Sequence, residues 1–371
     1  MQVKPVYDKI HAEQTLKGHY RMKSSEKDTK KQKENNNTKS RKIIKRIIKI
    51  LIVVIIIELL IFQGARMYFR IPVSEYYKNS EEAFVIPDIG DGFIAQGLAY
   101  DERSECFFIT GYMNDKSASP IYIVEKSSGL CLNKLSMKNA DGSDFHGHAG
   151  GLTIHGDYIY VAGSGDSCLY VFSYDTAINS EKNDTITCLG SFPMAENMSV
   201  AYTSSDSDSI YAGEFYREAN YQTPENHKMT TKAGDYNQAI IQRYRFSDSE
   251  DAVFGIETIP FEIYSVTDLV QGMDVYKGKI YLSTSYAVAF SHIFIYEKPQ
   301  STSTFNIAGK DIPLYELDSA SLKDDLKIPP MAEEIVFTDG KMYTMCESAS
   351  NKYIFGKLTS AKWCYATKIE D

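Results

Sequence analysis

The chain has 371 residues, of which 43% are hydrophobic and 24% charged, so it is long and apolar enough to bury a large core. Its charge is unevenly distributed. Residues 1–49 carry fifteen Lys and Arg against five Asp and Glu, which leaves a net charge of −19 for the rest of the chain. A domain this acidic repels a nucleic-acid backbone, so we expect no nucleic-acid partner.

The N-terminal tail, residues 1–42, is polar and rich in Lys and Asn. It has too few apolar positions to form a core, and we expect it to be disordered and cytoplasmic. Residues 43–65 follow, with the apolar centre ILIVVIIIELLIF interrupted only by Glu58. This segment is about as long as a membrane-spanning helix and is expected to contact the lipid bilayer.

The position of this apolar segment decides between an anchor and a signal peptide. About forty polar residues precede it and no A-x-A cleavage site follows it, which favours an uncleaved signal anchor. Positive charge is concentrated just before it, at residues 41–49. This charge predicts a single-pass protein of the cell membrane, with the N-terminus in the cytoplasm and the C-terminal domain outside.

Residues 66–82 are predicted to be a short stalk, and residues 83–371 an extracytoplasmic domain built from one repeated unit. The clearest copy, AGGLTIHGDYIYVAGSGDSCLYVF, occupies residues 149–172. It consists of a strand with an x-G-φ start, a tight turn, a strand of alternating aromatic and aliphatic residues, and a returning third strand. Counting this one, copies of the unit start at residues 96, 150, 198, 271 and 333, and the last copy is expected to continue into a third strand at residues 353–356.

A lone sheet of this size cannot bury both of its faces, so neighbouring units must stack, and spacings of about 50–75 residues suit four-stranded propeller blades. We therefore predict an all-β fold, a β-propeller of five blades, preceded by one transmembrane helix. Residues 83–86 are expected to pair with the last blade and close the ring. A β-sandwich with accidental similarity among its hairpins is the alternative.

The blade count depends on the long interval between the third and fourth units. Within residues 215–264 only 239–246 and 255–264 resemble strands, and they complete the third blade, so five blades are favoured and six stay open. Residues 217–236, which precede both of these segments, form a long polar loop, and loops of this length are usually functional or disordered.

All six cysteines lie in the domain expected outside the membrane, where disulfides can form. Cys106 and Cys131 would lie about two strand spacings apart, too far for a bridge. Cys168 and Cys188, on adjacent strands, are the one pair whose geometry allows a disulfide.

The repeat also predicts which residues surround the central channel, since the start of each innermost strand faces it. These are Gln96, Gly150, Met198, Gln271 and Glu333. The ends of the second strands add Tyr112, Ser164, Glu214, Phe215, Ser285 and Glu347. The sequence leaves open whether both sets share one mouth of the channel.

Most of the 27 tyrosines alternate within strands and are expected to pack between blades. Six aromatic residues instead fall in loops or at strand ends, where they could stack on a sugar ring or a peptide: Tyr112, Phe215, Tyr216, Tyr221, Tyr236 and Tyr286. The candidate ligand-binding residues are Gln96, Tyr112, His146, His148, Glu214, Tyr216, Gln271 and Glu333.

A metal site is a second hypothesis for the channel. The His146-Gly147-His148 sequence can place two imidazoles on one side of an extended chain, and Glu333 would complete a site for a divalent metal. Carboxylates around a mouth would equally suit Ca²⁺. The alternative is a solvated or hydrogen-bonded His-x-His. The sequence contains no G-x-S-x-G, H-E-x-x-H, phosphate-binding glycine loop or C-x-x-C.

Residues 83–371 resemble the β-propeller superfamily that includes gluconolactonase/regucalcin-like proteins and NHL- or YVTN-type bacterial surface propellers. The likeness rests on the hairpins QGLAY, GGLTI and QGMDVYKGKIYLS. For the lactonases, the resemblance implies a channel metal held by Glu, Asn and Asp. Only Glu333 matches such a Glu, while the other strand starts carry Gln, Gly or Met, a departure that argues against lactonase activity.

Two functions follow from these sequence features. The favoured one is a membrane-tethered module that binds a cell-wall glycan, a peptide or a surface protein through the channel mouth and the loop at 215–237. The alternative is a metal-dependent hydrolase of a lactone, phosphoester or glycan. In that case His146, His148, Glu333 and Glu214 would surround an ion that polarises the substrate and activates water.

Overall fold

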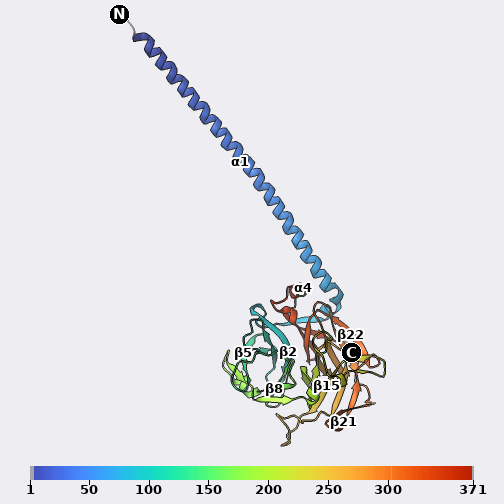
Figure 1. The fold of residues 1–371 in the computed structure, drawn as a ribbon. Helices are drawn as coiled ribbons and strands as arrows, with labels where there is room; N and C mark the ends of the chain where they lie inside the picture. The colour runs from blue at the N-terminus through green and yellow to red at the C-terminus, as the bar shows by residue number, and fades with distance from the viewer. Residues whose placement is uncertain (1–3, 302, 370–371) are drawn as a thin grey trace. The chain divides into compact units, whose positions relative to one another are not determined.

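The computed structural model describes residues 4–301 and 303–369, and it divides into two units, Met1–Ala65 and Arg66–Asp371. Helix α1, Lys4–Arg70, begins in the first unit and ends in the second (Figure 1). Its most apolar part has a mean hydropathy of 2.6 and no buried residue, so by length and composition it could cross a membrane as an anchor or serve as a signal. The polar residues 18–42, where we expected disorder, are helical and exposed and build no core.

The second unit is a five-bladed β-propeller, as predicted, in the part of the chain that the structure describes (Figure 1). In each blade four strands are paired in antiparallel order from the channel outward. The first blade contains β2 (Phe93–Asp101), β3 (Cys106–Met113), β4 (Pro120–Glu125) and β5 (Cys131–Lys138). The second contains β6 (Ala149–His155), β7 (Tyr158–Gly163), β8 (Cys168–Ser173) and β10 (Gly190–Pro193).

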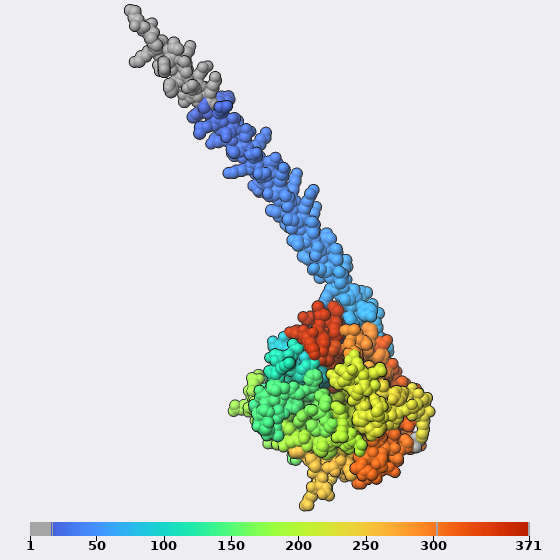
Figure 2. All heavy atoms as spheres, viewed as in Figure 1, coloured from blue at the N-terminus to red at the C-terminus, as the bar shows by residue number. Residues whose placement is uncertain are grey.

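The remaining three blades follow in chain order round the ring, as the colours in Figure 2 show. The third contains β11 (Val200–Ser205), β12 (Ser209–Glu214), β15 (Ala239–Arg245) and β16 (Glu262–Val266). The fourth contains β17 (Val270–Tyr276), β18 (Lys279–Thr284), β19 (Ser291–Glu297) and β22 (Leu322–Ile328). The fifth contains β23 (Ala332–Thr338), β24 (Lys341–Cys346), β25 (Trp363–Lys368) and β1 (Ser80–Val85).

Short elements complete the unit. Two blades gain strands from their neighbours: β9 (Thr185–Thr187) pairs in parallel with β5, and the hairpin β20 (Ser303–Ile307) and β21 (Lys310–Glu316) pairs in parallel with β16. Strands β13 (Met229–Thr230) and β14 (Tyr236–Asn237) form a separate ladder. The short helices are η1 (Ile71–Val73), α2 (Ser74–Lys78), η2 (Ile89–Asp91), α3 (Tyr174–Asn179), η3 (Ala195–Asn197), η4 (Glu225–His227), η5 (Glu347–Ala349) and α4 (Gly356–Thr359).

Four of the predicted blade starts are confirmed, since residues 96, 150, 271 and 333 lie within innermost strands. The third was placed too early: β11 begins at Val200, and Met198, predicted at the channel, is fully buried in the core between the second and third blades. Residues 239–245 and 262–266 complete the third blade, which settles the count at five. The predicted closure of the ring is also confirmed, because β1 pairs antiparallel with β25. The segment 353–356, expected to be the third strand of the fifth blade, forms no strand, and β25 takes that place.

Each innermost strand carries a β-bulge at the same point of the repeat. The ladder register shifts between Ala95 and Leu98 in the first blade, and at the corresponding point of the other four. A bulge bends its strand and redirects its side chains. Glycine at this point lets neighbouring strands touch, because a Cβ on Gly97 would lie 2.2 Å from the carbonyl oxygen of Gly150. The x-G-φ pattern therefore marks the contact between innermost strands.

Aromatic side chains fill the spaces between blades, as the alternation predicted. Phe107 of the first blade lies 4.7 Å, centroid to centroid, from Tyr343 of the fifth, and Phe84 of β1 lies 5.2 Å from Phe107. All three are buried. Burying an aromatic side chain of this kind removes a large apolar area from water, so these contacts hold the closed ring together.

The predicted stalk packs on the propeller. Val73 and Tyr76 are buried in a cluster with Ile328 of the fourth blade and Tyr365 of the fifth. Residues 66–78 thus run along the outside of these two blades before β1 begins at Ser80.

All six cysteines are free. The expected bridge between Cys168 and Cys188 does not form, because the strand register keeps them apart. Cys168 pairs with Pro193 at the end of β10, whereas Cys188 precedes the other end of the same strand.

The contact between innermost strands can be tested with one methyl group. The Gly97→Ala change would press a Cβ against the Gly150 carbonyl and Thr110, so we expect a loss of about 1–3 kcal/mol in the free energy of unfolding. Urea denaturation of the full chain in detergent measures it. Gly90→Ala is the matched control, because a Cβ there meets no atom within 4 Å. Equal stability of the two variants would contradict the close approach.

Candidate functional site

A pocket of about 550 Å³ opens at one mouth of the channel, and we call it the axial pocket. Its lining includes starts of innermost strands, among them Gln96 and Gln271, and residues at or beyond ends of second strands, such as Tyr112 and Glu347. In antiparallel strands these two points meet at one edge of the blade. The two predicted sets of channel residues therefore do share one mouth.

Four of the eight predicted ligand-binding residues line the axial pocket: Gln96, Tyr112, His148 and Gln271. Ser164, Phe215 and Ser285, also expected at the channel, line it as well. The other four lie elsewhere. His146 is exposed outside the lining, while Glu214 and Tyr216 are buried at the third blade and Glu333 is buried below the pocket floor.

The predicted metal ligands do not come together. Across the described residues, no group of three or more His, Cys, Asp or Glu side chains is placed to hold a metal ion. The sequence suggested His146, His148 and Glu333, but His146 is exposed outside the axial pocket, whereas Glu333 is 2% exposed and lies in the bulge of β23.

The pocket floor is a hydrogen-bonded cluster around Glu347. Its Oε1 accepts hydrogen bonds from the hydroxyl groups of Tyr353 at 2.6 Å and Tyr112 at 3.2 Å. The Lys352 ammonium donates to the Tyr112 hydroxyl at 2.9 Å. These bonds hold both tyrosine rings upright in the wall. Tyr353 was not predicted at the site, because residues 353–356 were expected to be a strand, and no pattern in the sequence singled out Lys352.

Two carboxyl groups share this floor. Burial raises the pKa of Glu347, and it raises the pKa of Glu333 well above its usual range, with the charge of Glu347 adding to the effect. One oxygen of Glu333 has no hydrogen-bond partner in the described structure. Because two neighbouring buried carboxylates cannot easily both ionise, at least one stays protonated at neutral pH.

The wall is mainly aromatic. The His148 ring stacks on Tyr112 with centroids 4.0 Å apart, and burial with the nearby Lys352 charge lowers the pKa of His148, so its imidazole is neutral at pH 7. Phe215 and Tyr221 meet edge to face at 5.3 Å. The wall therefore presents flat faces as well as hydrogen-bonding atoms.

The long loop at 217–236 is ordered and supplies Tyr221 to the wall. A buried hydrogen-bonded pair connects this loop to the third blade. His227 Nδ1 lies 2.9 Å from Glu214 Oε1, and Glu214 also accepts a hydrogen bond from the backbone N–H of Ile240. The Thr223 hydroxyl donates to the Gln238 carbonyl at 2.5 Å. Glu214 thus holds the loop in place instead of facing a ligand.

Glu334 crosses the middle of the channel. It starts from β23 in the fifth blade, and its Oε1 accepts from the backbone N–H of Met273 in the fourth at 2.8 Å. Its other oxygen lies 2.3 Å from the point where Gly151 of the second blade would carry a Cβ. Burial raises the pKa of Glu334 well above its usual range, so we expect its carboxyl to be neutral. This buried side chain lies between the two mouths of the channel.

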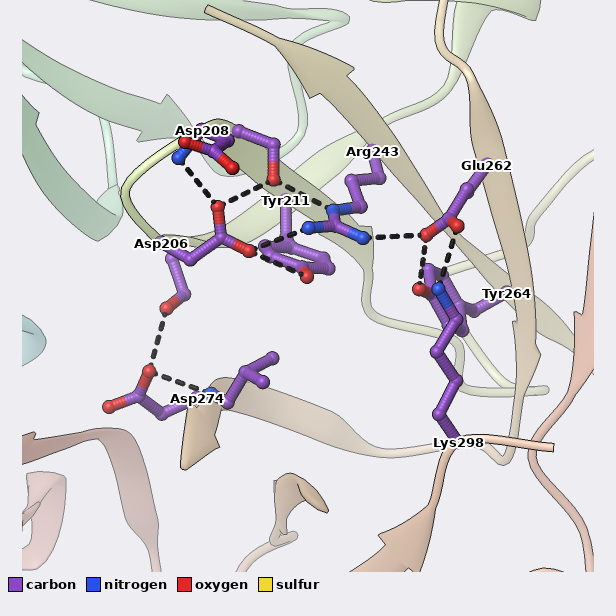
Figure 3. Close-up of polar contacts among 11 residues, drawn as sticks. Asp206, Asp208, Tyr211, Arg243, Glu262, Tyr264, Asp274 and Lys298 are labelled. Atoms are coloured by element: carbon purple, nitrogen blue, oxygen red, sulfur yellow. Dashed lines mark hydrogen bonds and ion pairs between the residues drawn. The ribbon is translucent and has the colours of Figure 1, made fainter. Parts of the chain in front are cut away.

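The opposite mouth holds a smaller hollow of about 210 Å³, lined in part by Asp206 and Asp274. Asp274 accepts from the backbone N–H groups of Val275 at 2.7 Å and Phe337 at 2.6 Å, and burial raises its pKa to about 7. Asp206 pairs with Arg243 at 2.6 Å, and Arg243 pairs with Glu262 at 2.8 Å (Figure 3).

The network at this second mouth continues to Lys298, which pairs with Glu262 at 2.6 Å and ties the third blade to the fourth (Figure 3). The carboxylates Asp206, Glu262 and Asp274 are thus each engaged by cations, hydroxyls or backbone N–H groups. We assign them a structural role and treat the axial pocket as the candidate site.

No protein-family model matches the sequence, and no curated protein matches it in sequence. Several solved structures are similar. Glutaminyl cyclase from Myxococcus xanthus is 9% identical with a TM-score of 0.40, over 78% of this chain and 95% of that one. A PQQ-bound aldose sugar dehydrogenase from Streptomyces coelicolor is 10% identical with a TM-score of 0.39, over 77% and 95%.

A putative oxidoreductase (glucose dehydrogenase) from Thermus thermophilus is 10% identical with a TM-score of 0.40, over 77% of this chain and 98% of that one. Similarity at this level carries no argument about activity. The strand pairing defines the class of this protein: a five-bladed β-propeller that follows a long apolar helix.

The buried carboxyl at the channel centre should affect how stability depends on pH. The pKa of Glu334 is raised in the folded chain, so this carboxyl lowers the free energy of unfolding once the unfolded chain can ionise it. Its contribution to stability is complete below the pKa of the unfolded chain, about 4.3, and is lost as pH rises toward the folded pKa. Each such group contributes a decline of up to about 1.4 kcal/mol per pH unit. We expect Glu334→Gln to make this decline shallower between about pH 5 and 7.

Urea denaturation at a series of pH values measures this decline. Glu82→Gln is the control, since Glu82 is an exposed carboxyl on β1 and should leave the slope as in the wild type. A Glu334→Gln protein with the wild-type slope would show that this carboxyl is ionised in the folded chain.

Proposed function

We propose that this protein is a membrane-tethered, extracytoplasmic binding module whose axial pocket takes a neutral, hydroxylated ligand of carbohydrate type. The observation that carries the proposal is the composition of the pocket wall. Amide groups of Gln96 and Gln271 and hydroxyls of serines from separate blades converge on one space that also presents aromatic faces.

The polar residues of the lining match the hydroxyl groups of a sugar, and its aromatic residues match the apolar face of a sugar ring. Amides and hydroxyls can both donate and accept hydrogen bonds, as sugar hydroxyls do. Tyr221 and Tyr286 offer rings on which the apolar face of a pyranose can stack, and the Arg217 guanidinium lies 4.0 Å above the Tyr286 ring and holds it in place. A pocket of this size accommodates a ligand of one to a few sugar rings.

The charges at the floor favour a ligand without net charge. Lys352 is the cation of the lining, and Glu347 and the buried Glu333 below it carry raised pKa values. With one of the two carboxyls protonated, the floor holds one positive and one negative charge that offset each other. A strongly anionic or cationic ligand would find no unbalanced partner there.

The sequence and the long apolar helix support the proposed location of the module. Positive charge at residues 41–49 precedes the apolar segment, which favours a cytoplasmic N-terminus, and the helix is long and apolar enough to span a bilayer. The acidic propeller would then face the outside, where cell-wall glycans, peptides and surface proteins are available. The hydrolase alternative lacks a gathered set of ligands among the described residues.

Stacking in the pocket can be tested by exchanging one tyrosine. A glycan array of neutral and charged oligosaccharides identifies binders of the full chain in detergent, and titration calorimetry measures affinity for the best neutral one. We expect Tyr221→Ala to weaken binding about 3- to 10-fold, because the change removes a stacking face.

Tyr236→Ala is the matched control for Tyr221→Ala. Both side chains belong to the 215–237 segment, with exposed fractions of 57% for Tyr236 and 48% for Tyr221, but Tyr236 lies outside the pocket lining and its loss should leave the affinity unchanged. Equal effects of the two variants would refute the proposed site, and an array that retains only charged glycans would refute the neutral ligand.

A further inference from the structure

The chain enters the propeller beside the axial pocket. Phe69, in the last turn of α1, stacks on Phe355 with ring centroids 6.1 Å apart and meets Phe290 edge to face at 6.4 Å. The Arg70 guanidinium donates to the Ser360 hydroxyl at 3.3 Å. All of these contacts lie within the second unit.

The two loops that receive Phe69 also form part of the pocket wall, and we call residues 285–290 and 347–360 the rim. The first loop contributes Ser285 and Tyr286 to the axial pocket, and the second contributes Glu347 and Tyr353. In Figure 2 the red C-terminal segment lies against the light-blue start of the second unit. The pocket and the entry point of the chain thus share one edge of the propeller.

The rim carries apolar side chains that nothing covers in the described structure. Ile354 is 82% exposed and Val288 is 58% exposed, and both are next to residues of the pocket wall. Met67, Tyr68 and Ile71 of the entering segment are exposed too. Aromatic and aliphatic residues next to a membrane span are typical of positions at the lipid interface.

The length of chain between the apolar segment and the rim is short. Phe69 follows Ala65, the last residue of the apolar segment, by four residues, which span at most about 14 Å even when fully extended. If the apolar segment spans a bilayer, the loops that contact Phe69 lie within reach of its outer headgroups.

We propose that the rim is a lipid-contacting surface, in which Ile354 and Val288 enter the outer leaflet and turn the axial pocket toward the membrane. This inference rests on the membrane anchoring in the proposed function. Exposure alone does not carry it, because Leu130, at the opposite edge of the first blade, is 64% exposed. The position of the rim next to the entering chain distinguishes it from such scattered residues.

Tryptophan fluorescence quenched by brominated lipids tests the contact. The chain has one tryptophan, Trp363, so Trp363→Phe gives a dark background for Ile354→Trp and Val288→Trp in the full chain, reconstituted into liposomes. Because interfacial side chains enter the headgroup and acyl boundary by about 5–10 Å, we expect both to lose roughly half of their fluorescence.

Leu130→Trp in the same background is the matched control. It replaces an equally exposed apolar residue that precedes β5, at the edge far from the rim, and it should keep its fluorescence. Strong quenching at position 130 with none at 354 and 288, or equal quenching at all three, would overturn the proposal. Circular dichroism of each variant checks its folding. Two rim positions are used so that one still tests the proposal where the other variant does not fold.

The anchoring itself is tested separately, by sedimentation of the same liposomes in alkaline carbonate. A chain that stays in the supernatant would refute the membrane anchor and with it the proposed location. A chain that sediments but shows no rim quenching would refute only the lipid-contacting rim.

Discussion

Close approach of the five innermost strands is the constraint on which this structure depends. Each strand bulges at the same step of the repeat, and in three blades a glycine, such as Gly97 or Gly272, lies where the neighbouring backbone passes. The bulge turns adjacent residues toward the axis, so one local feature both packs the ring and aims Gln96 and Gln271 into the axial pocket.

The two mouths of the channel differ in how their carboxyl groups are used. At the second mouth, Asp206 and Glu262 compensate the charge of Arg243, and backbone N–H groups saturate Asp274. At the axial pocket, Glu347 faces open space with only part of its hydrogen-bonding capacity used. Glu334 separates the two environments with a neutral carboxyl that spans the channel. The carboxyl groups of one mouth are thus engaged by other groups of the protein, whereas the other mouth keeps an open pocket.

The sequence predicted the fold well because the repeated residue pattern follows the hairpin that each blade repeats. The x-G-φ start occurs in three of the five copies, and the turn with its alternating second strand occurs in all of them, so the five hairpins and the closing strand were predicted. Hairpin β20 and β21 was not predicted, since it inserts in the fourth blade and pairs with the third, and no local pattern encodes a partner. The site was predicted in part. Glu333 was expected to line the channel mouth but is buried below the pocket floor beside Glu347, and Tyr353 was missed because residues 353–356 were predicted to be a strand.

The strand that closes the ring is also the first strand after the apolar helix. A mechanical load between the bilayer and a ligand held in the axial pocket would act first on Phe69 and Arg70, then on the buried Tyr76, and only then on the ladder between β1 and β25. The load would reach that ladder at Ser80, the first residue of β1, so its hydrogen bonds would open from this end only after the packing of Phe69 and Tyr76 had been lost. The ring is therefore fastened where a tethered protein would be pulled.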